Sequence, residues 1–190
     1  MMMHLQDLVG ADKMKSWYER FGFGKSTNGM FDGELKGNIA WSNELQQKTS
    51  AFGQSTTVTP VQMIQAQSAF FNKGNMLKPW FVQSIDNPIS KKTFYKGEKK
   101  IAGKPITSET ADKVETELDK VVNSDKSHAS NYRIDGYDIE GKTGTAQVVN
   151  SWKARTSSVV QPFILGIVIS PSVTANTLLF GNNFVLALVD

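Results

Sequence analysis

Apolar residues recur at near-helical spacing in three stretches of the chain, and each stretch predicts a helix. The first covers residues 1–21 and ends where Gly22 and Gly24 interrupt the pattern. The third covers about residues 108–122, and early acidic residues there suit the positive end of a helix dipole. The buried stripe of this third helix is expected to consist of Ala111, Val114, Leu118 and Val121.

The second predicted helix has clear start and stop signals. Thr59 is a natural N-cap, Pro60 suits the first helical position, and Gly74 follows the last turn. The apolar residues between these signals lie on all sides of the helix axis, so we expect the helix to be buried in the middle of a domain. They are Val61, Met63, Ile64, Ala66, Ala69, Phe70 and Phe71.

The segments outside these helices carry turn and strand signals. Residues 22–38 are rich in glycine and predict an irregular connection. Residues 76–85 look extended, with an interruption at Pro79, and the basic run 91–100 predicts a solvated hairpin or loop. Residues 137–149 show a β-like pattern.

Composition narrows the possible classes of function. The 190 residues suffice for one domain or for part of a larger one. A net charge of +3 without a basic stripe gives no support for a nucleic-acid partner. The absence of Cys excludes disulfides, thiolate zinc sites and cysteine nucleophiles, and no metal or cofactor site is predicted. No signal peptide or membrane anchor is expected, because neither a basic leader nor an uninterrupted apolar run of 18 residues occurs.

The end of the chain differs from the rest in its charge. Residues 156–189 contain no charged side chain, which is unusual for a domain of this composition. We therefore expect residues 151–190 to form an atypical, charge-poor tail, produced by a frameshift or a truncated gene, behind a first segment of residues 1–150.

Two motifs that carry chemistry overlap near residue 140. Residues 136–143 match the phosphate-binding loop G-x-x-x-x-G-K-T, which needs a buried strand before it and a helix after it. The polar segment 130–135 and the β-branched segment 144–150 do not suit these flanks. Asp138 and Glu140 would also place negative charge beside the phosphates. A nucleotide-binding protein is therefore the weaker alternative.

The second motif is Lys142-Thr143-Gly144, followed by Thr145. Lys142 offers a fixed positive charge for a carboxylate, and the two threonines offer hydroxyl groups. Gly144 lets a substrate lie against the backbone. On an edge strand, the backbone could also pair with an extended peptide. Three residues alone are weak evidence, because such a tripeptide is common in strands and turns.

The surrounding sequence makes the second motif more specific. Five segments occur in one order and at domain-scale spacing: Trp17–Gly24, Ser50–Gln54, Val58–Met63, Asn72–Gly74 and Lys142–Gln147. Over residues 1–150 the chain resembles the transpeptidase domain of class B penicillin-binding proteins, the division-type enzymes of Gram-positive bacteria.

This resemblance implies a fold and an activity. The fold would be the α+β fold of the penicillin-binding transpeptidases and serine β-lactamases, with helices packed on an antiparallel sheet, here incomplete. The family transfers acyl groups from D-Ala–D-Ala stem peptides of peptidoglycan, or reacts with β-lactams, through a serine nucleophile and without a cofactor or metal. The parent proteins lie in the plasma membrane, with this domain on the extracytoplasmic face.

The resemblance also assigns roles to individual residues. Lys142 would help to bind the substrate carboxylate, and Thr143 and Thr145 would donate hydrogen bonds to it. Gly144 would leave space for the substrate, and the N–H of Thr145 would form half of the oxyanion hole. Gln147 would lie further along the same strand, near the site.

The sequence departs from the family in its nucleophile. No S-x-x-K occurs anywhere in it, so no catalytic residue is assigned. Ser26-Thr27-Asn28 spells S-x-N, but it follows the first helix, whereas the family motif precedes that helix. We expect a fragment that is inactive alone. The alternative is one half of a split transpeptidase, with a partner chain that supplies S-x-x-K and S-x-N.

Overall fold

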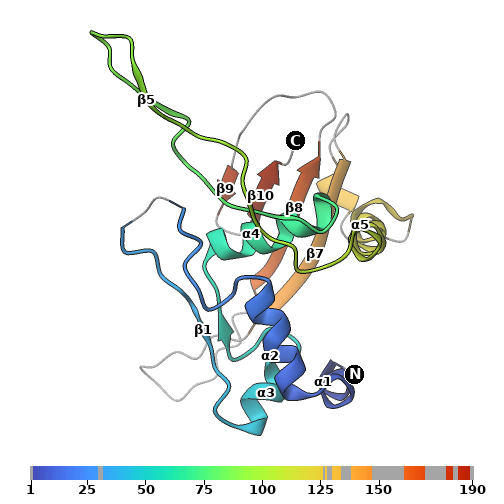
Figure 1. The fold of residues 1–190 in the computed structure, drawn as a ribbon. Coiled ribbons are helices and arrows are strands. Elements are labelled where there is room, and N and C mark those ends of the chain that lie inside the picture. The colour runs from blue at the N-terminus through green and yellow to red at the C-terminus, as the bar shows by residue number, and fades with distance from the viewer. Residues whose placement is uncertain are drawn as a thin grey trace. The chain divides into compact units, whose positions relative to one another are not determined.

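The structure is a computed structural model that divides into two compact units, residues 1–111 and 112–190 (Figure 1). It describes residues 2–29, 32–125, 127, 130–133, 138–146, 161–169, 179–181 and 184–188. Positions 138, 143–146 and those from 161 onward are described by their backbone alone. The two units are described separately below.

The first unit begins with two helices where the sequence pattern predicted one. Helix α1 spans Met2–Val9 and helix α2 spans Ala11–Arg20. Gly10 separates them with a φ of +88°, a conformation that glycine adopts without steric cost. The prediction of a single helix was therefore wrong at this residue, although the helical character of both halves was correct.

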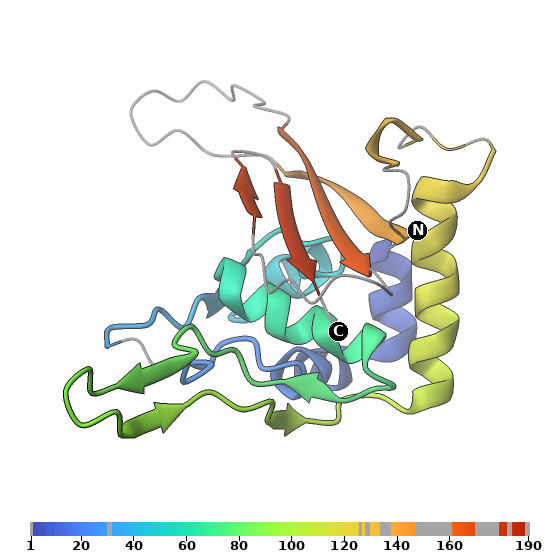
Figure 2. The same cartoon turned by 90° about the horizontal axis from the view of Figure 1, so that it is seen from above.

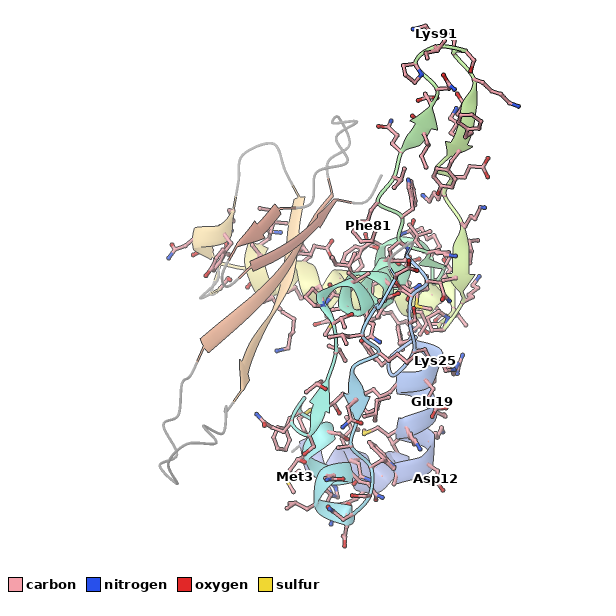
Figure 3. The ribbon with its side chains drawn as sticks, turned by 90° about the vertical axis from the view of Figure 1, so that its left-hand side faces the viewer. Met3, Asp12, Glu19, Lys25, Phe81 and Lys91 are labelled. Atoms are coloured by element: carbon pink, nitrogen blue, oxygen red, sulfur yellow. The ribbon has the colours of Figure 1, made fainter. Side chains whose placement is uncertain are left out.

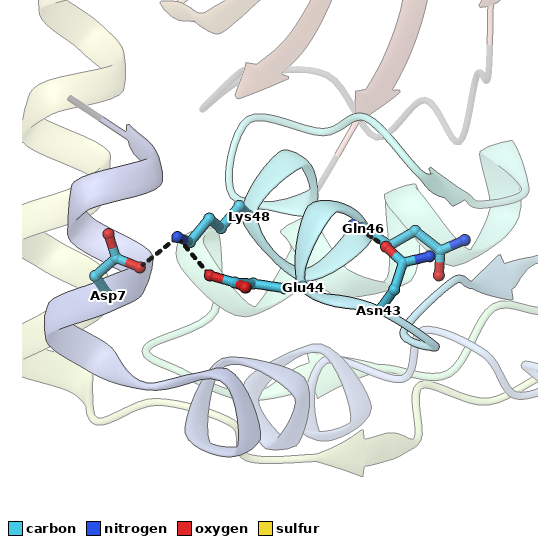
Figure 4. Close-up of polar contacts among 5 residues, drawn as sticks. All are labelled: Asp7, Asn43, Glu44, Gln46 and Lys48. Atoms are coloured by element: carbon cyan, nitrogen blue, oxygen red, sulfur yellow. Dashed lines mark hydrogen bonds and ion pairs between the residues drawn. The ribbon is translucent and has the colours of Figure 1, made fainter.

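Helix α3, Glu44–Ser50, was not predicted from the sequence. Its residues are mostly polar, so no apolar period marks it. Polar contacts hold it instead: the Asn43 side chain caps it by accepting from the N–H of Gln46, at 2.9 Å (Figure 4). The Lys48 ammonium lies 2.7 Å from Glu44 on the same helix and 3.6 Å from Asp7 on α1.

Helix α4, Pro60–Phe71, confirms the second predicted helix. Thr59 and Gln62 form a capping box, in which each side chain bonds the backbone of the other residue. The expected burial was only partly correct. Ala66 and Ala69 are buried, but the other buried positions on this helix are polar: Gln62, Gln65 and Ser68.

Gln62 connects this helix to the glycine-rich segment of the first unit. It is only 1% exposed, and its Nε2 donates to the carbonyl oxygens of Lys25 and Lys36, each at 2.7 Å. Its Oε1 accepts from the N–H of Thr59 at 2.9 Å. One buried amide thereby satisfies two carbonyl groups of a segment that has little secondary structure of its own, and the N–H of the α4 N-cap.

The strands of the first unit form three short antiparallel pairs. They are β1 (Asn38–Ile39) with β2 (Thr56–Thr57), β3 (Met76–Leu77) with β6 (Ile101–Gly103), and β4 (Ser84–Asp86) with β5 (Thr93–Lys96). The predicted solvated hairpin is confirmed as β4–β5, with Lys91 at its far end (Figure 3). The predicted extended segment 76–85 contains only β3 and the start of β4.

Glu34 fixes the loop that follows α2. Its carboxylate accepts from the Ser26 hydroxyl at 2.5 Å, and from the Thr27 N–H and hydroxyl at 2.9 and 2.7 Å. Burial alone would raise the pKa of Glu34, but these hydrogen bonds, with a further one from the Gly29 N–H, outweigh it and lower the pKa. The ionised carboxylate is therefore part of the folded loop.

The second unit contains a mixed four-stranded sheet, visible from above in Figure 2. Its strands are β7 (Asp138–Ala146), β8 (Gln161–Ile169), β9 (Leu179–Gly181) and β10 (Phe184–Leu188), in the order β7-β8-β10-β9. The β7–β8 and β10–β9 pairs are antiparallel, and β10 runs parallel to β8. A 3₁₀ turn, Ser130–Tyr132, precedes the sheet.

Helix α5, Ser108–Asn123, confirms the third predicted helix and crosses the boundary between the units. Ala111 is fully buried as predicted, and Val122, at 1% exposure, is more deeply buried than the predicted Val121. Helices and strands together confirm the α+β class. Within the described residues, no helix is long and apolar enough to span a membrane.

We predict that Gln62→Leu lowers the free energy of unfolding by about 3 kcal/mol, because two carbonyl groups and one N–H lose their partner in a buried place. Equilibrium urea unfolding measures this change. The control is Gln83→Leu, the same substitution at an exposed glutamine, which should change stability by less than about 0.5 kcal/mol. Equal losses in both variants would show that Gln62 does not hold the segment.

We also predict that Glu34 makes stability depend on pH in the acid range. Its pKa is lower in the folded than in the unfolded chain, so its contribution is complete above the unfolded pKa, about 4.5. The contribution is lost as the pH falls through the lower, folded pKa. Glu34→Gln should cost about 1 kcal/mol at pH 7, and the difference from the wild type should shrink toward pH 3. A difference that stays constant between pH 7 and 3 in urea unfolding would contradict this role.

Candidate functional site

The motif Lys142-Thr143-Gly144-Thr145 lies within β7, which is an edge strand among the strands that the structure describes. The strand pairs with β8 on one side, with Lys142 opposite Leu165 and Gly144 opposite Phe163. The sequence-based expectation of an edge strand is confirmed for the backbone of 138–146. An edge strand leaves every second residue with its N–H and C=O directed away from its partner strand.

Two observations indicate which residues of β7 face the open edge. The carbonyl oxygen of Ile139 accepts a hydrogen bond from the Asn123 side-chain amide at 3.1 Å, so this carbonyl points away from β8. Thr145 is opposite Pro162, which has no N–H to donate. A proline fits best in a pair whose two residues direct their backbone groups away from each other.

Ile139 and Thr145 are six residues apart, which is an even number, so their backbone groups point to the same side of the strand. The odd-numbered residues of β7 direct their N–H and C=O outward, and the even-numbered ones bond to β8. The N–H groups of Thr143 and Thr145 consequently lie along the open edge. Asn123, the last residue of α5, occupies the edge beside Ile139.

Two of the side chains that the structure describes on β7 carry opposite charges. Glu140 is 7% exposed and Lys142 is exposed. They are two residues apart, so they lie on the same face of the strand, and Ile139, at 2% exposure, lies on the other. An exposed cation beside outward backbone groups can bind a carboxylate and pair with an extended chain at the same time.

The phosphate-loop alternative is wrong. Lys142 and Thr143 lie inside an extended strand, whereas that motif requires them at the start of a helix. Backbone N–H groups along a strand alternate in direction and cannot surround a phosphate as a loop does.

Other predicted residues fall in different places. Gln147 lies outside the described residues. Ser26-Thr27-Asn28 lies in the first unit, where the Ser26 and Thr27 hydroxyls bond Glu34. Sequence reasoning missed Asn123 and Pro162. Pro162 was visible only as an interruption of an apolar run, and no local signal marks Asn123. Within the described part of the chain, no cluster of His, Asp or Glu could hold a metal ion.

Comparisons with known proteins identify relatives of this chain. The sequence model described as "Penicillin binding protein transpeptidase domain" matches residues 1–181. Stage V sporulation protein D of Bacillus subtilis is 32% identical over 165 residues, which cover 85% of this chain and 25% of that protein. The chain thus spans about a quarter of the length of the curated relatives it matches.

Solved structures share the fold. Apo penicillin-binding protein 3 of Mycobacterium tuberculosis matches with a TM-score of 0.74 at 24% identity, over 87% of this chain and 39% of that one. The same protein complexed with ampicillin matches with the same TM-score. Penicillin-binding protein 2X of Streptococcus thermophilus matches with a TM-score of 0.73 at 24% identity, over 86% of this chain and 25% of that one.

The direction of the backbone groups on β7 predicts a pattern of amide hydrogen exchange. The N–H groups of Lys142 and Gly144 should exchange slowly, because they bond to β8, and those of Thr143 and Thr145 should exchange faster. Nuclear magnetic resonance of the chain after transfer to deuterated water measures each rate. Protection of Thr143 and Thr145 above Lys142 and Gly144 would reverse the assignment of the open edge.

Proposed function

The chain belongs to the penicillin-binding protein transpeptidase family, and we propose that it forms the part of a transpeptidase domain that binds substrate along β7. The observation that carries this proposal is the position of Lys142-Thr143-Gly144 on an edge strand. The odd-numbered residues of this strand direct their backbone N–H and C=O groups away from β8. The substrate class is a peptidoglycan stem peptide that ends in D-Ala–D-Ala, or a β-lactam.

Each residue of the motif has a role in this proposal. The exposed Lys142 ammonium binds the substrate carboxylate, and the Thr143 and Thr145 hydroxyls donate hydrogen bonds to it. Gly144 allows the substrate to approach the backbone. The N–H of Thr145 is half of the oxyanion hole, which its outward direction supports. Gln147, which lies outside the described residues, is proposed as a further substrate-binding residue.

The chemistry also needs a nucleophile. In acyl transfer, a serine hydroxyl attacks the carbonyl carbon of the penultimate D-Ala, the bond to the terminal D-Ala breaks, and an acyl-enzyme forms. The amine of a second stem peptide then displaces the serine. The printed sequence contains no S-x-x-K, so we infer that this chain alone binds substrate without reacting. A partner chain that carries S-x-x-K and S-x-N would complete the site.

The same proposal extends to β-lactams. The structural relative complexed with ampicillin supports β-lactam binding, because it shares the fold of this chain. The carboxylate of a β-lactam would then occupy the place of the stem-peptide carboxylate beside Lys142. A role in cell division and a location at the extracytoplasmic face of the plasma membrane are proposals from the family as well.

The interpretation of residues 151–190 as a frameshifted tail stays a prediction. The family match extends past residue 150 to residue 181, and strands β8, β9 and β10 all come from this part of the chain. The DNA that flanks the reading frame, together with the intact mass of the native protein, would decide the origin of this segment.

We predict that the chain incubated alone with a fluorescent penicillin gains no covalent label and keeps its intact mass. Together with a second chain that carries S-x-x-K and S-x-N from a relative, labelling should occur on the serine of that second chain. Lys142→Gln should reduce the labelling rate about tenfold or more, because the carboxylate loses a charge-assisted hydrogen bond.

The matched control is Lys104→Gln, the same change at an exposed lysine outside β7. It should leave the labelling rate unchanged. A covalent adduct on the chain alone would contradict the absence of a nucleophile, and equal rates in Lys142→Gln and Lys104→Gln would contradict the role of Lys142.

A further inference from the structure

The first unit contains a cavity of about 350 Å³ that no part of the proposed reaction uses. It lies between the end of α2, the loop that follows α2, strand β3 and strand β6. Its volume is at the lower end of the range for small-molecule sites, about 300–1,000 Å³. Its charged and amide side chains are Glu19, Arg20, Lys25, Asn28, Gln65 and Lys78.

The cavity has an excess of positive charge. Three cations, Arg20, Lys25 and Lys78, line it, and Glu19 is the one carboxylate among the lining residues that the structure describes. Glu19 and Lys25 lie on the same side of the first unit in Figure 3. The unit as a whole carries 14 Lys and Arg against 9 Asp and Glu, so its net charge of +5 exceeds that of the full chain, which is +3. The field at this cavity therefore favours an anion.

Part of this lining is held in place before any ligand binds. The Arg20 Nη2 donates to the Pro105 carbonyl oxygen at 2.5 Å, and its guanidinium lies 4.1 Å from the centre of the Trp17 ring. The hydroxyls of Ser26 and Thr27 are taken by Glu34. The donors that remain for a ligand include the two lysines, the side-chain amides of Asn28 and Gln65, and the Arg20 N–H groups that do not bond Pro105.

Gln65 contributes a neutral side-chain amide to the lining of the cavity. It is 5% exposed, and its side chain lines the cavity. None of the residues that the structure describes hydrogen-bonds to its carboxamide. Gly22 keeps this space open, because a Cβ there would lie 3.3 Å from the Gln65 Oε1.

We propose that this cavity binds a small organic oxyanion, a carboxylate or phosphate compound of about two negative charges, through Lys25, Lys78 and Gln65. The net charge of the lining matches such a dianion, and the Gln65 amide supplies a neutral hydrogen bond to one of its oxygens. The site is independent of the β7 edge and of the proposed transpeptidase function.

Isothermal titration calorimetry of the chain at low ionic strength tests this site with two organic dianions, succinate for carboxylates and glycerol 3-phosphate for phosphates. At least one probe should bind saturably with a stoichiometry of one, and the stronger probe identifies the class. The double variant Lys25→Gln/Lys78→Gln should weaken binding at least tenfold. Gln65→Leu should weaken it as well, in a chain whose circular dichroism is unchanged.

The matched control is Lys91→Gln/Lys92→Gln, which removes the same charge from the exposed β4–β5 hairpin. It should change the dissociation constant less than twofold. Equal weakening by the two double variants would show that only the overall charge attracts the anion. Binding lost in Lys142→Gln would assign the anion to β7, and no saturable binding of either probe would also overturn the proposal.

Discussion

The direction of the backbone groups along β7 is the constraint on which the proposed function of this chain depends. Successive residues of a strand direct their N–H and C=O groups to alternate sides. With the opposite alternation, the backbone N–H of Thr145 would point toward β8. Two unrelated contacts, the Asn123 amide on the Ile139 carbonyl and the pairing of Thr145 with Pro162, agree on the same alternation. In the proposed site, the Lys142 side chain binds the substrate carboxylate beside the outward N–H groups of Thr143 and Thr145.

The two units have different electrostatic characters. Residues 1–111 carry a net charge of +5, and residues 112–190 carry 7 basic and 9 acidic residues, a net charge of −2. The positive excess of the chain therefore belongs to the unit that contains the cavity. In the other unit, Lys142 lies on a strand that also contains Asp138 and Glu140.

The sequence predicted those parts of the fold that local signals determine. Thr59, Pro60 and Gly74 mark the limits of α4, and an apolar stripe marks α5, because caps and periodicity act over a few residues. Helix α3 was not predicted, because its sequence has no apolar stripe. An ion pair with Asp7 and a cap at Asn43 hold this helix. The alternation of β7 and the cavity around Gln65 depend on residues distant in the sequence, so local patterns cannot predict them.

The most direct test of the account is a titration of the ¹⁵N-labelled chain with a diacetylated L-Lys–D-Ala–D-Ala peptide, followed by nuclear magnetic resonance. The account predicts that the amide signals of Thr143 and Thr145 shift as the peptide binds along the open edge, while those of Lys142 and Gly144 shift much less. Lys142→Gln should abolish these shifts. Larger shifts at Lys142 and Gly144, or shifts confined to residues outside β7, would contradict the assignment of this strand as the substrate-binding edge.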